Sequence, residues 1–536
     1  MTSTLETARQ TVPQNITIAP GAPGADAEKA ALDALVANPP ATMLVVSDLH
    51  LSAGRDPATG RFDRIENFFA DEAFDRFLAH YHPAAAEGAL LVLNGDTLDF
   101  LRVVGTPLSA RELDAWRARL ATLGVQMTAA QLEASIDRKE RRYGLGTEDF
   151  KCVWKLDEIA AGHRRFFAAL AGWVGAGGRM LVVKGNHDVE LHWPLVRLAM
   201  RRMLGAAPGG TGPGSIVFCD DFVRLANVFL EHGHAYETPT RVEGPPTLIV
   251  KQDGRDVETI RLPSGSFVNR YLINSAEDIY PFLDNARPLK KSIRLILRRH
   301  PFRALLLVPP AFQLIRKSLR ISGGSTARSV LLLLNILGPL VGIVLVALIL
   351  SFDRVAEVVR TILPKYGKSL SLLGAALPYL MSAIADSMPK KKGKVMDDEF
   401  SDLAYRALAA RRPTVPKTVL YAVYGHTHTM DVQLVAPRNG VPTVLYLNTG
   451  TWTPLYIDDR PDLIGRSFRP FLRFTLGAGG EYRHEYLQWN DEAGVADPIE
   501  ILGPVRRNGA EGAAVIREPE PAQPAEAGNA APAVGP

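Results

Sequence analysis

Short apolar runs recur along the chain and end abruptly at polar residues. Such runs, rich in β-branched side chains and bounded by glycine or polar residues, predict buried strands. They occupy residues 42–47, 89–93, 179–183, 227–230 and 419–423. Residues 62–80 and 156–173 have the apolar spacing of helices and lie between some of these runs. The alternation predicts an α/β domain of the βαβ type, which binds its ligands at the carboxyl ends of its strands.

A longer stretch, residues 106–178, separates the second run from the third. Leu113, Trp116 and Leu120 recur within it at helical spacing. The stretch is therefore predicted to be a helical insertion whose apolar residues face the core. The same helices could also cover a site at the strand ends and select its substrates.

The amino-acid composition limits the kinds of protein that this chain can be. The 536 residues are 47% hydrophobic and 22% charged, which is typical of a globular chain with two or three structural units. The two cysteines, Cys152 and Cys219, cannot form a disulfide framework. The net charge of +4 is small for this length, so no nucleic-acid partner is expected. The first residues lack a basic start followed by an apolar run, so no secretory signal is expected.

The polar residues that follow the five runs share one kind of chemistry. In chain order they are Asp48-x-His50, Gly95-Asp96-x-x-Asp99, Gly185-Asn186-His187-Asp188, His232-Gly233-His234 and Gly425-His426-x-His428. Carboxylate and amide oxygens and imidazole nitrogens suit Mn, Fe, Zn or Mg, and no thiolate is among them. Two such ions about 3.5–4 Å apart can clamp the oxygens of an in-line displacement and lower the pKa of a bound water.

These five motifs, in this order and each after a predicted strand, resemble those of the calcineurin-like metallophosphoesterases. The resemblance covers residues 41–235 and 417–480, a little under half of the chain. It implies a layered β-sandwich flanked by helices, with two divalent metal ions (Mn, Fe or Zn) as cofactors. It also implies an enzyme that hydrolyses a phosphoester or pyrophosphate bond by attack of a metal-bound hydroxide on phosphorus.

The resemblance assigns a role to each motif residue. The first ion would be held by Asp48, His50 and His428, Asp96 would bridge both ions, and the second ion would be held by Asn186, His232 and His426. His187 would stabilise the phosphoryl oxygens or protonate the leaving alkoxide without binding metal. Asp99, Asp188 and His234 are expected to support the ligands by hydrogen bonding, because a ligating imidazole usually has its other N–H oriented by a neighbour.

The interval between the fourth and fifth motifs has an unusual charge pattern. Residues 285–352 contain no Asp or Glu, and a cluster of Lys and Arg precedes an uncharged apolar stretch at 329–351. As a helix this stretch would be about 34 Å long, enough for a hydrocarbon core of about 30 Å. Gly338-Pro339, near its middle, would kink or break it.

Residues 369–388 form a second apolar stretch, and Lys residues follow it. Because the motifs on either side of the insertion must share ions, any membrane would be crossed an even number of times. The basic clusters at both outer ends place them at the cytoplasmic face of the inner membrane. Residues 285–394 are thus expected to contact a membrane, as a two-span hairpin or as peripheral helices lying on anionic lipid. Buried helices of a soluble cap or dimer are the third interpretation.

The sequence predicts five parts of the chain. They are a flexible tail at 1–40, the first part of the metallophosphoesterase domain at 41–235, the long and largely helical membrane-associating insertion at 236–416, the second part of the domain at 417–505 and a disordered tail at 506–536. Both tails are rich in Pro, Ala and Gly and lack periodic apolar positions.

Within the family, the motifs and the expected membrane affinity are similar to the UDP-2,3-diacylglucosamine diphosphatase branch of lipid A synthesis. The chain departs from that branch in its greater length and in His187, where Arg is expected after the Asn. A lipid-linked pyrophosphate or phosphodiester is one expected substrate. The alternatives are a membrane-tethered phosphatase or phosphodiesterase of soluble substrates such as nucleotides, and a noncatalytic scaffold that uses the fold as a binding platform.

We predict that the full chain sediments with membranes. If residues 285–394 lie on anionic lipid, high salt will release the protein, because salt screens the attraction between the basic cluster and the lipid. A two-span hairpin will instead require detergent. Fractionation of cells with successive salt and detergent washes distinguishes the two arrangements, and a wholly soluble pool would contradict both.

Overall fold

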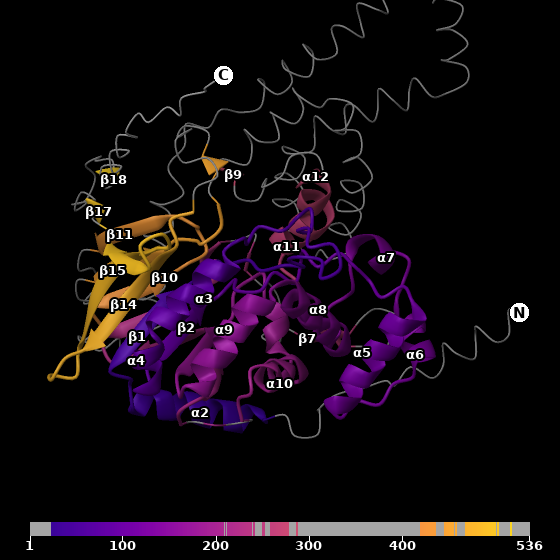
Figure 1. The fold of residues 1–536 in the computed structure, drawn as a ribbon, viewed down its shortest axis with the longest axis horizontal. Coiled ribbons are helices and arrows are strands. Elements are labelled where there is room, and N and C mark those ends of the chain that lie inside the picture. Colours follow the sequence, from indigo (N-terminus) through magenta and orange to yellow (C-terminus); the bar gives the residue numbers. More distant parts are fainter. Residues whose placement is uncertain are drawn as a thin grey trace, which may run out of the picture.

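The computed structural model describes residues 23–237 with gaps at 208–209 and 211, together with 240–241, 249–251, 258–277, 286–287, 419–435, 444–454, 456–457, 467–499, 501–502 and 515–516. These residues form two large β-sheets flanked by helices, together with three two-stranded sheets (Figure 1). All five apolar runs that predict strands form strands. The mixed α/β class is therefore confirmed.

The first sheet has seven strands in the order β16-β15-β14-β1-β2-β3-β4. Its parallel half is formed by β1 (Thr42–Val46), β2 (Leu90–Asn94), β3 (Arg179–Val183) and β4 (Ile216–Cys219). Its antiparallel half is formed by β14 (Pro470–Leu476), β15 (Tyr482–Asn490) and β16 (Val495–Pro498). β1 joins the halves, with Met43 opposite Leu90 on one side and Phe474 on the other. Distant parts of the sequence therefore complete one sheet.

The second sheet has five strands in the order β11-β12-β10-β6-β5. They are β5 (Phe222–Leu225), β6 (Val228–Glu231), β10 (Tyr421–Tyr424), β11 (Met430–Val435) and β12 (Val444–Thr449). β10 runs parallel to both β6 and β12. The carboxyl ends of these three strands therefore lie at one edge, although β6 and β10 are far apart in the sequence.

Alternate residues of β1 face two different cores. Met43 and Val45 belong to the core between the two sheets, whereas Leu44 and Val46 belong to the core beneath the helices. Because both faces are buried, the strand is apolar throughout and does not alternate with polar residues. A smaller core that includes Phe229 covers the outer face of the second sheet. The layers are thus helices, first sheet and second sheet.

The described helices of the first part of the domain lie mainly against the first sheet. They are α2 (Ala25–Ala37), α3 (Asp71–His80), α4 (His82–Ala86), α5 (Ala110–Thr122), α6 (Ala129–Ser135), α7 (Glu140–Tyr143), α8 (Asp149–Gly162), α9 (Arg164–Gly175) and α10 (Pro194–Met203). Figure 1 shows α3, α4 and α9 beside β1 and β2. Helices α5 to α9 occupy the stretch 106–178, and the Leu113, Trp116 and Leu120 side chains of α5 are buried as predicted.

Three stretches differ from the sequence prediction. Residues 62–70 form a loop, not the start of α3, because the Glu66 carboxylate accepts backbone N–H groups of Ser52, Gly54 and Phe68. The helical stretch 156–173 is divided at His163 into α8 and α9. Residues 25–37 were expected in the flexible tail but form α2, which buries Ala31 and Leu35 in the core between the sheets.

Some short elements lie in the insertion or in the C-terminal tail, or pair with strands there. They are β7 (Ile249–Lys251), β8 (Glu258–Ile260), α11 (Ser264–Val268), the π-helical turn η3 (Asn269–Ile273), α12 (Asn274–Glu277), β9 (Ala286–Arg287) paired with β13 (Tyr456–Ile457), and β17 (Ile501–Leu502) paired with β18 (Val515–Ile516). β18 lies within the predicted disordered tail, whose other residues are not described.

The predicted membrane segments fall outside the described residues. Both candidate spans, 329–351 and 369–388, and all of 285–394 except β9 lie there. Among the helices that are described, none combines the length and the apolar character needed to cross a bilayer. The membrane-associating role of the insertion therefore stays a prediction.

A buried histidine connects α8 and α9 to the loop after β1. His163 Nδ1 lies 3.0 Å from Asp71 Oδ1, and its Nε2 lies 3.2 Å from Glu66 Oε2. Burial would lower the pKa of His163, but Glu66 and Asp71 outweigh it and raise this pKa to about 9. The imidazole is therefore charged at neutral pH and compensates two carboxylates. Glu66 in turn holds Ser52, two residues after His50.

We predict that this cluster makes stability depend on pH above neutrality. The folded pKa of His163 lies above its unfolded value of about 6.5, so the stabilisation is complete below pH 6.5 and is lost as the pH rises through about 9. The loss is on the order of 3 kcal/mol. Urea unfolding of the metal-free wild type and of His163→Gln should show free energies of unfolding that differ most at pH 6 and converge near pH 10. A constant difference would contradict the assignment.

Candidate metal centre

Side chains from the ends of five strands meet in one buried region. Asp48 and His50 follow β1, Asp96 and Asp99 follow β2, Asn186, His187 and Asp188 follow β3, His232 follows β6, and His426 and His428 follow β10. Asp48 and His232 have no exposed surface, and Asp96 is only 1% exposed. The parallel strands of each sheet end at this region, which is where α/β sheets place their ligands.

Three groups of side chains have the geometry to hold a metal ion. They are Asp48, His50 and His428; Asp96, His232 and His426; and His50, Asp96 and His187. Within each group the donor atoms lie within 4.8 Å of one another. The first group consists of the three residues predicted to bind the first ion, and the second contains Asp96 with His232 and His426 but not Asn186. Asp96 and His50 each belong to two of the three groups, so the groups adjoin one another. Which residue binds which ion stays a prediction.

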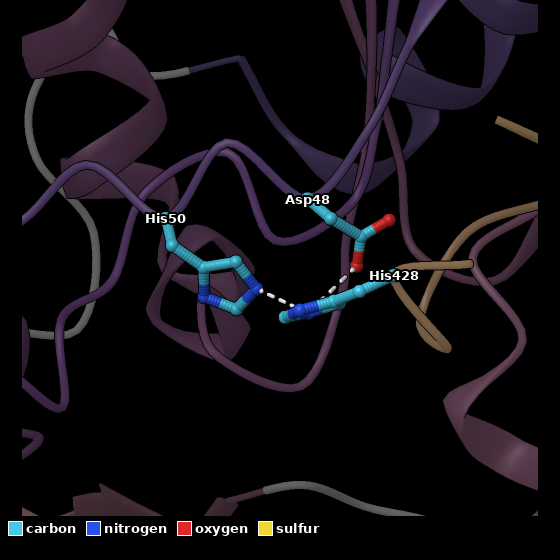
Figure 2. Close-up of side chains that lie close together, drawn as sticks. All are labelled: Asp48, His50 and His428. Carbon is cyan, nitrogen blue, oxygen red and sulfur yellow. Dashed lines mark hydrogen bonds and ion pairs between the residues drawn. The ribbon is translucent and has the colours of Figure 1, made fainter. Parts of the chain in front are cut away.

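The first group is closely packed (Figure 2). His50 Nε2 lies 2.9 Å from His428 Nε2, and His428 Nε2 lies 3.5 Å from Asp48 Oδ1. All three side chains point toward one small volume. Two imidazole nitrogens and a carboxylate oxygen are a suitable ligand set for Mn, Fe or Zn.

A single oxygen of Asp99 orients two of the imidazoles. Asp99 Oδ2 lies 3.2 Å from His50 Nδ1 and 2.8 Å from His187 Nδ1. Burial would raise the pKa of Asp99, but His187, His50 and Arg102 outweigh it and lower this pKa well below its usual range. The ionised carboxylate can only accept, so both rings carry hydrogen on Nδ1. Nε2 of His50 is thereby set to bind metal, and Nε2 of His187 is the atom that can act on a substrate.

His232 and Asp96 present two acceptor atoms to each other. His232 Nδ1 donates to the backbone oxygen of Asn94 at 2.9 Å, and its Nε2 lies 3.0 Å from Asp96 Oδ2. Burial would lower the pKa of His232, but the Asp96 carboxylate outweighs it and raises this pKa to about 9. A cation is needed between the two atoms, and in the metal-free protein it is a proton. The pair therefore fits a divalent ion.

His426 is oriented by a carboxylate that lies outside the five sequence motifs. Its Nε2 lies 3.2 Å from Glu237 Oε2, and its backbone nitrogen donates to both carboxylate oxygens of Asp48 at 3.0 Å. Because Glu237 accepts from Nε2, Nδ1 is the ring atom available to a metal. Glu237 lies five residues after His232 but has no distinguishing sequence pattern, so only the fold identifies it.

Asn186 carries a buried amide oxygen and directly precedes a residue that contacts Asp96. The neighbouring His187 backbone nitrogen donates to Asp96 Oδ1 at 2.8 Å. Asn186 Oδ1 is buried, and the described part of the chain offers it no hydrogen bond. Buried polar atoms are rarely left unsatisfied, so this oxygen is suited to bind a cation.

The backbone at the site is held in an uncommon conformation. Five predicted ligands have positive φ angles: Asp48 (53°), His50 (52°), Asp96 (49°), His426 (71°) and His428 (61°). Among the described non-glycine residues only Ala226 and Arg469 share this property. Such conformations cost roughly 1–3 kcal/mol each and concentrate at functional sites. The fold therefore places these side chains at an energetic cost.

Two motif glycines are required by close approach. A Cβ at Gly185 would lie 2.5 Å from the Asp96 backbone nitrogen and would collide with the Asp96 carboxylate. A Cβ at Gly425 would lie 2.5 Å from Ser47 Oγ and would collide with the Asp48 carboxylate. Glycine is therefore required before Asn186 and before His426, because the Asp96 and Asp48 carboxylates occupy the space that a side chain at these positions would need.

The other predicted supporting residues have different surroundings. Asp188 accepts the backbone N–H groups of Gly185 at 2.6 Å and Thr97 at 3.0 Å, so it connects the loops after β2 and β3. The His234 ring lies 5.5 Å from the His232 ring, and His234 belongs to none of the three metal-capable groups.

The loop after β12 also contributes to the site, although it follows none of the five predicted strands. Ser47 Oγ contacts Thr449 Oγ1 and the Asp48 carboxylate, and Thr451 Oγ1 donates to the Asp48 backbone oxygen at 2.5 Å. The apolar run 444–447 ends at Asn448-Thr-Gly, which is the same signal that identified the other five loops.

No protein-family model matches this sequence, and no match is found among curated proteins. The α/β sheets and the buried His and Asp groups are compatible with a metallophosphoesterase. Membership of that family stays a prediction from the five motifs.

We predict that Gly185→Ala weakens metal binding. The added methyl group must displace Asp96, and an altered ligand geometry typically costs about 10- to 100-fold in metal affinity. Gly172→Ala in α9 is the matched control, because no atom lies within 4 Å of its added Cβ. Metal content after dialysis and titration calorimetry measure the effect. Equal affinity of the two variants would contradict the placement of Asp96 among the ligands.

Proposed function

We propose that this protein is a metal-dependent phosphoesterase with two divalent ions, of the calcineurin-like type. The observation that supports the proposal is the convergence of predicted site residues from five strand ends in one buried region that includes the Asp96 carboxylate. Two carboxylates, four imidazoles and an amide oxygen are enough for two ions. When bound, the ions supply Lewis acidity toward phosphoryl oxygens and a water of lowered pKa.

The residues of the chain supply orientation and proton transfer. Asp99 holds the His50 ring through Nδ1, so that Nε2 is available to the ion. Glu237 holds the His426 ring through Nε2, so that Nδ1 is available to the ion. His187 donates its Nδ1 hydrogen to Asp99, so a proton on Nε2 can pass to the leaving oxygen of a phosphoester or pyrophosphate. Its ring lies edge-to-face with His50 at 4.6 Å, next to the first group of ligands.

The His187 position also bears on whether the protein is a scaffold. Since His187 belongs to a metal-capable group with His50 and Asp96, it could serve as an additional ligand. The Asp99 contact favours the acid role, because the same carboxylate that orients His187 would stabilise its protonated form. A noncatalytic metal-binding platform would not need this arrangement.

The proposed substrate is a lipid-linked pyrophosphate or phosphodiester at the cytoplasmic face of a membrane. The basic and apolar pattern of residues 285–394 supports this proposal. A soluble phosphate ester such as a nucleotide is the second candidate. Detergent-solubilised protein assayed on lipid pyrophosphates, cyclic dinucleotides and phosphomonoesters distinguishes the two.

We predict that the purified protein hydrolyses an artificial phosphodiester only with added divalent metal such as Mn. His187→Ala should retain its metal and lose about 10²- to 10⁴-fold in kcat, which is the usual contribution of a general acid. His80→Ala, an exposed histidine at the end of α3, is the matched control and should keep full activity. Full activity in excess chelator would contradict metal dependence, and a wild type that binds about two ions yet hydrolyses nothing would favour the scaffold.

A further inference from the structure

Part of the insertion is anchored directly beside the metal centre. The segment from α11 through α12 lies in the insertion by sequence, yet Asn274 Nδ2 donates to the backbone oxygen of Leu101 at 2.9 Å. Arg270 Nη2 donates to the backbone oxygen of Leu145 at 2.7 Å. The segment thus contacts both the loop after β2 and the loop between α7 and α8.

A buried arginine connects this segment to the loop that orients the histidines. Arg102 donates through Nη2 to Glu277 Oε1 at 2.9 Å, and its Nη1 contacts the other oxygen of the same carboxylate. Arg102 Nε lies 3.3 Å from Asp99 Oδ2. The side chains of Arg102 and Asp99 have no exposed surface, and that of Glu277 is 1% exposed. All three charges are therefore shielded from solvent.

Arg102 contacts the same oxygen of Asp99 that orients the two imidazoles. Asp99 Oδ2 is the atom near Nδ1 of both His50 and His187 and near Nε of Arg102. A shift of this one atom changes the orientation of a predicted metal ligand and of the predicted acid together.

We propose that Glu277 is a positioning residue for the metal centre, acting through Arg102 and Asp99 on His50 and His187. The inference rests on the proposed function for its kinetic test only. Glu277 occupies the planar end of the guanidinium with both its oxygens, so that Nε is left beside Asp99, 3.3 Å from Oδ2. Without the Glu277 charge, the guanidinium would turn its paired N–H groups toward Asp99, because bidentate pairing with a carboxylate is favoured. Asp99 Oδ2 would then move away from the imidazoles.

A purely structural role would have a different signature. The α2–α10 contact provides the comparison, because Arg201 pairs with Glu28 through Nη1 at 2.6 Å and Nη2 at 2.7 Å. Arg201 has no exposed surface, and the Glu28 side chain is 11% exposed. Glu28→Gln therefore removes the same charge from a similar buried pair, without touching the metal centre.

The kinetic experiment compares Glu277→Gln with Glu28→Gln in the full chain. Glu277→Gln should lower kcat by about threefold to thirtyfold, the range typical of coupling through an intermediate network. KM for an artificial phosphodiester and the metal content should stay near the wild-type values. Glu277→Asp, which keeps the charge, should recover part of kcat, and Glu28→Gln should keep wild-type kcat. A wild-type kcat in Glu277→Gln, or an equal loss in both Gln variants, would overturn the proposal.

A second experiment does not depend on activity. Unfolding midpoints of the metal-free protein are measured for Glu277→Gln, Asp99→Asn and the double variant, and for the matching set with Glu28→Gln. Because Glu277 and Asp99 share Arg102, the first set should be non-additive, whereas the distant Glu28 should give additive shifts. Additive shifts in the first set would overturn the inference. If the wild type hydrolyses nothing, the proposed function fails and this double-variant set alone decides the inference.

Discussion

The burial of the Asp96 carboxylate is the constraint on which the rest of the site depends. One of its oxygens accepts the His187 backbone N–H, and the other faces His232 Nε2 at 3.0 Å and His50 Nε2 at 3.9 Å. A carboxylate in this position is costly unless positive charge compensates it. The pKa of Asp96 is nevertheless held well below its usual value, because His232 and His187 outweigh burial. The surroundings thus keep it ionised, which is the state that binds metal.

The layered fold accounts for how such a costly arrangement is maintained. β1, β2 and β3 are buried on both faces, so their ends are fixed before any ligand is considered. Each ligand loop leaves a fixed strand end, and backbone N–H groups of one loop contact the carboxylates of another, as His426 does with Asp48. The unfavourable φ angles are therefore sustained by packing and hydrogen bonds elsewhere, as is usual when strain is found at a site.

The sequence predicted the features that depend on local patterns. Strand ends could be read because buried parallel strands are continuous apolar runs, and the ligands could be read because they directly follow those runs. The apolar spacing around Glu66 predicts helix, whereas the loop is held in part by hydrogen bonds that Glu66 accepts from Ser52 and Gly54, more than ten residues away. Glu237 and Glu277 were missed for the same reason. Each gains its role from a tertiary contact, with His426 or Arg102, that no local pattern encodes.

The hydrogen bonds around Asp99 have an arrangement that metal binding alone does not require. A site that only held ions would need each imidazole oriented by some acceptor, and separate acceptors would suffice, as Asn94 does for His232 and Glu237 for His426. Here one oxygen serves both His50 and His187, so a ligand and a residue predicted to move a proton share one support. Arg102 contacts the same oxygen and is itself paired with Glu277. The Arg102–Glu277 pair therefore influences how strongly the Asp99 carboxylate stabilises a protonated His187. This shared support favours the proposed enzyme over a noncatalytic scaffold, because a scaffold that only binds ions would not need it.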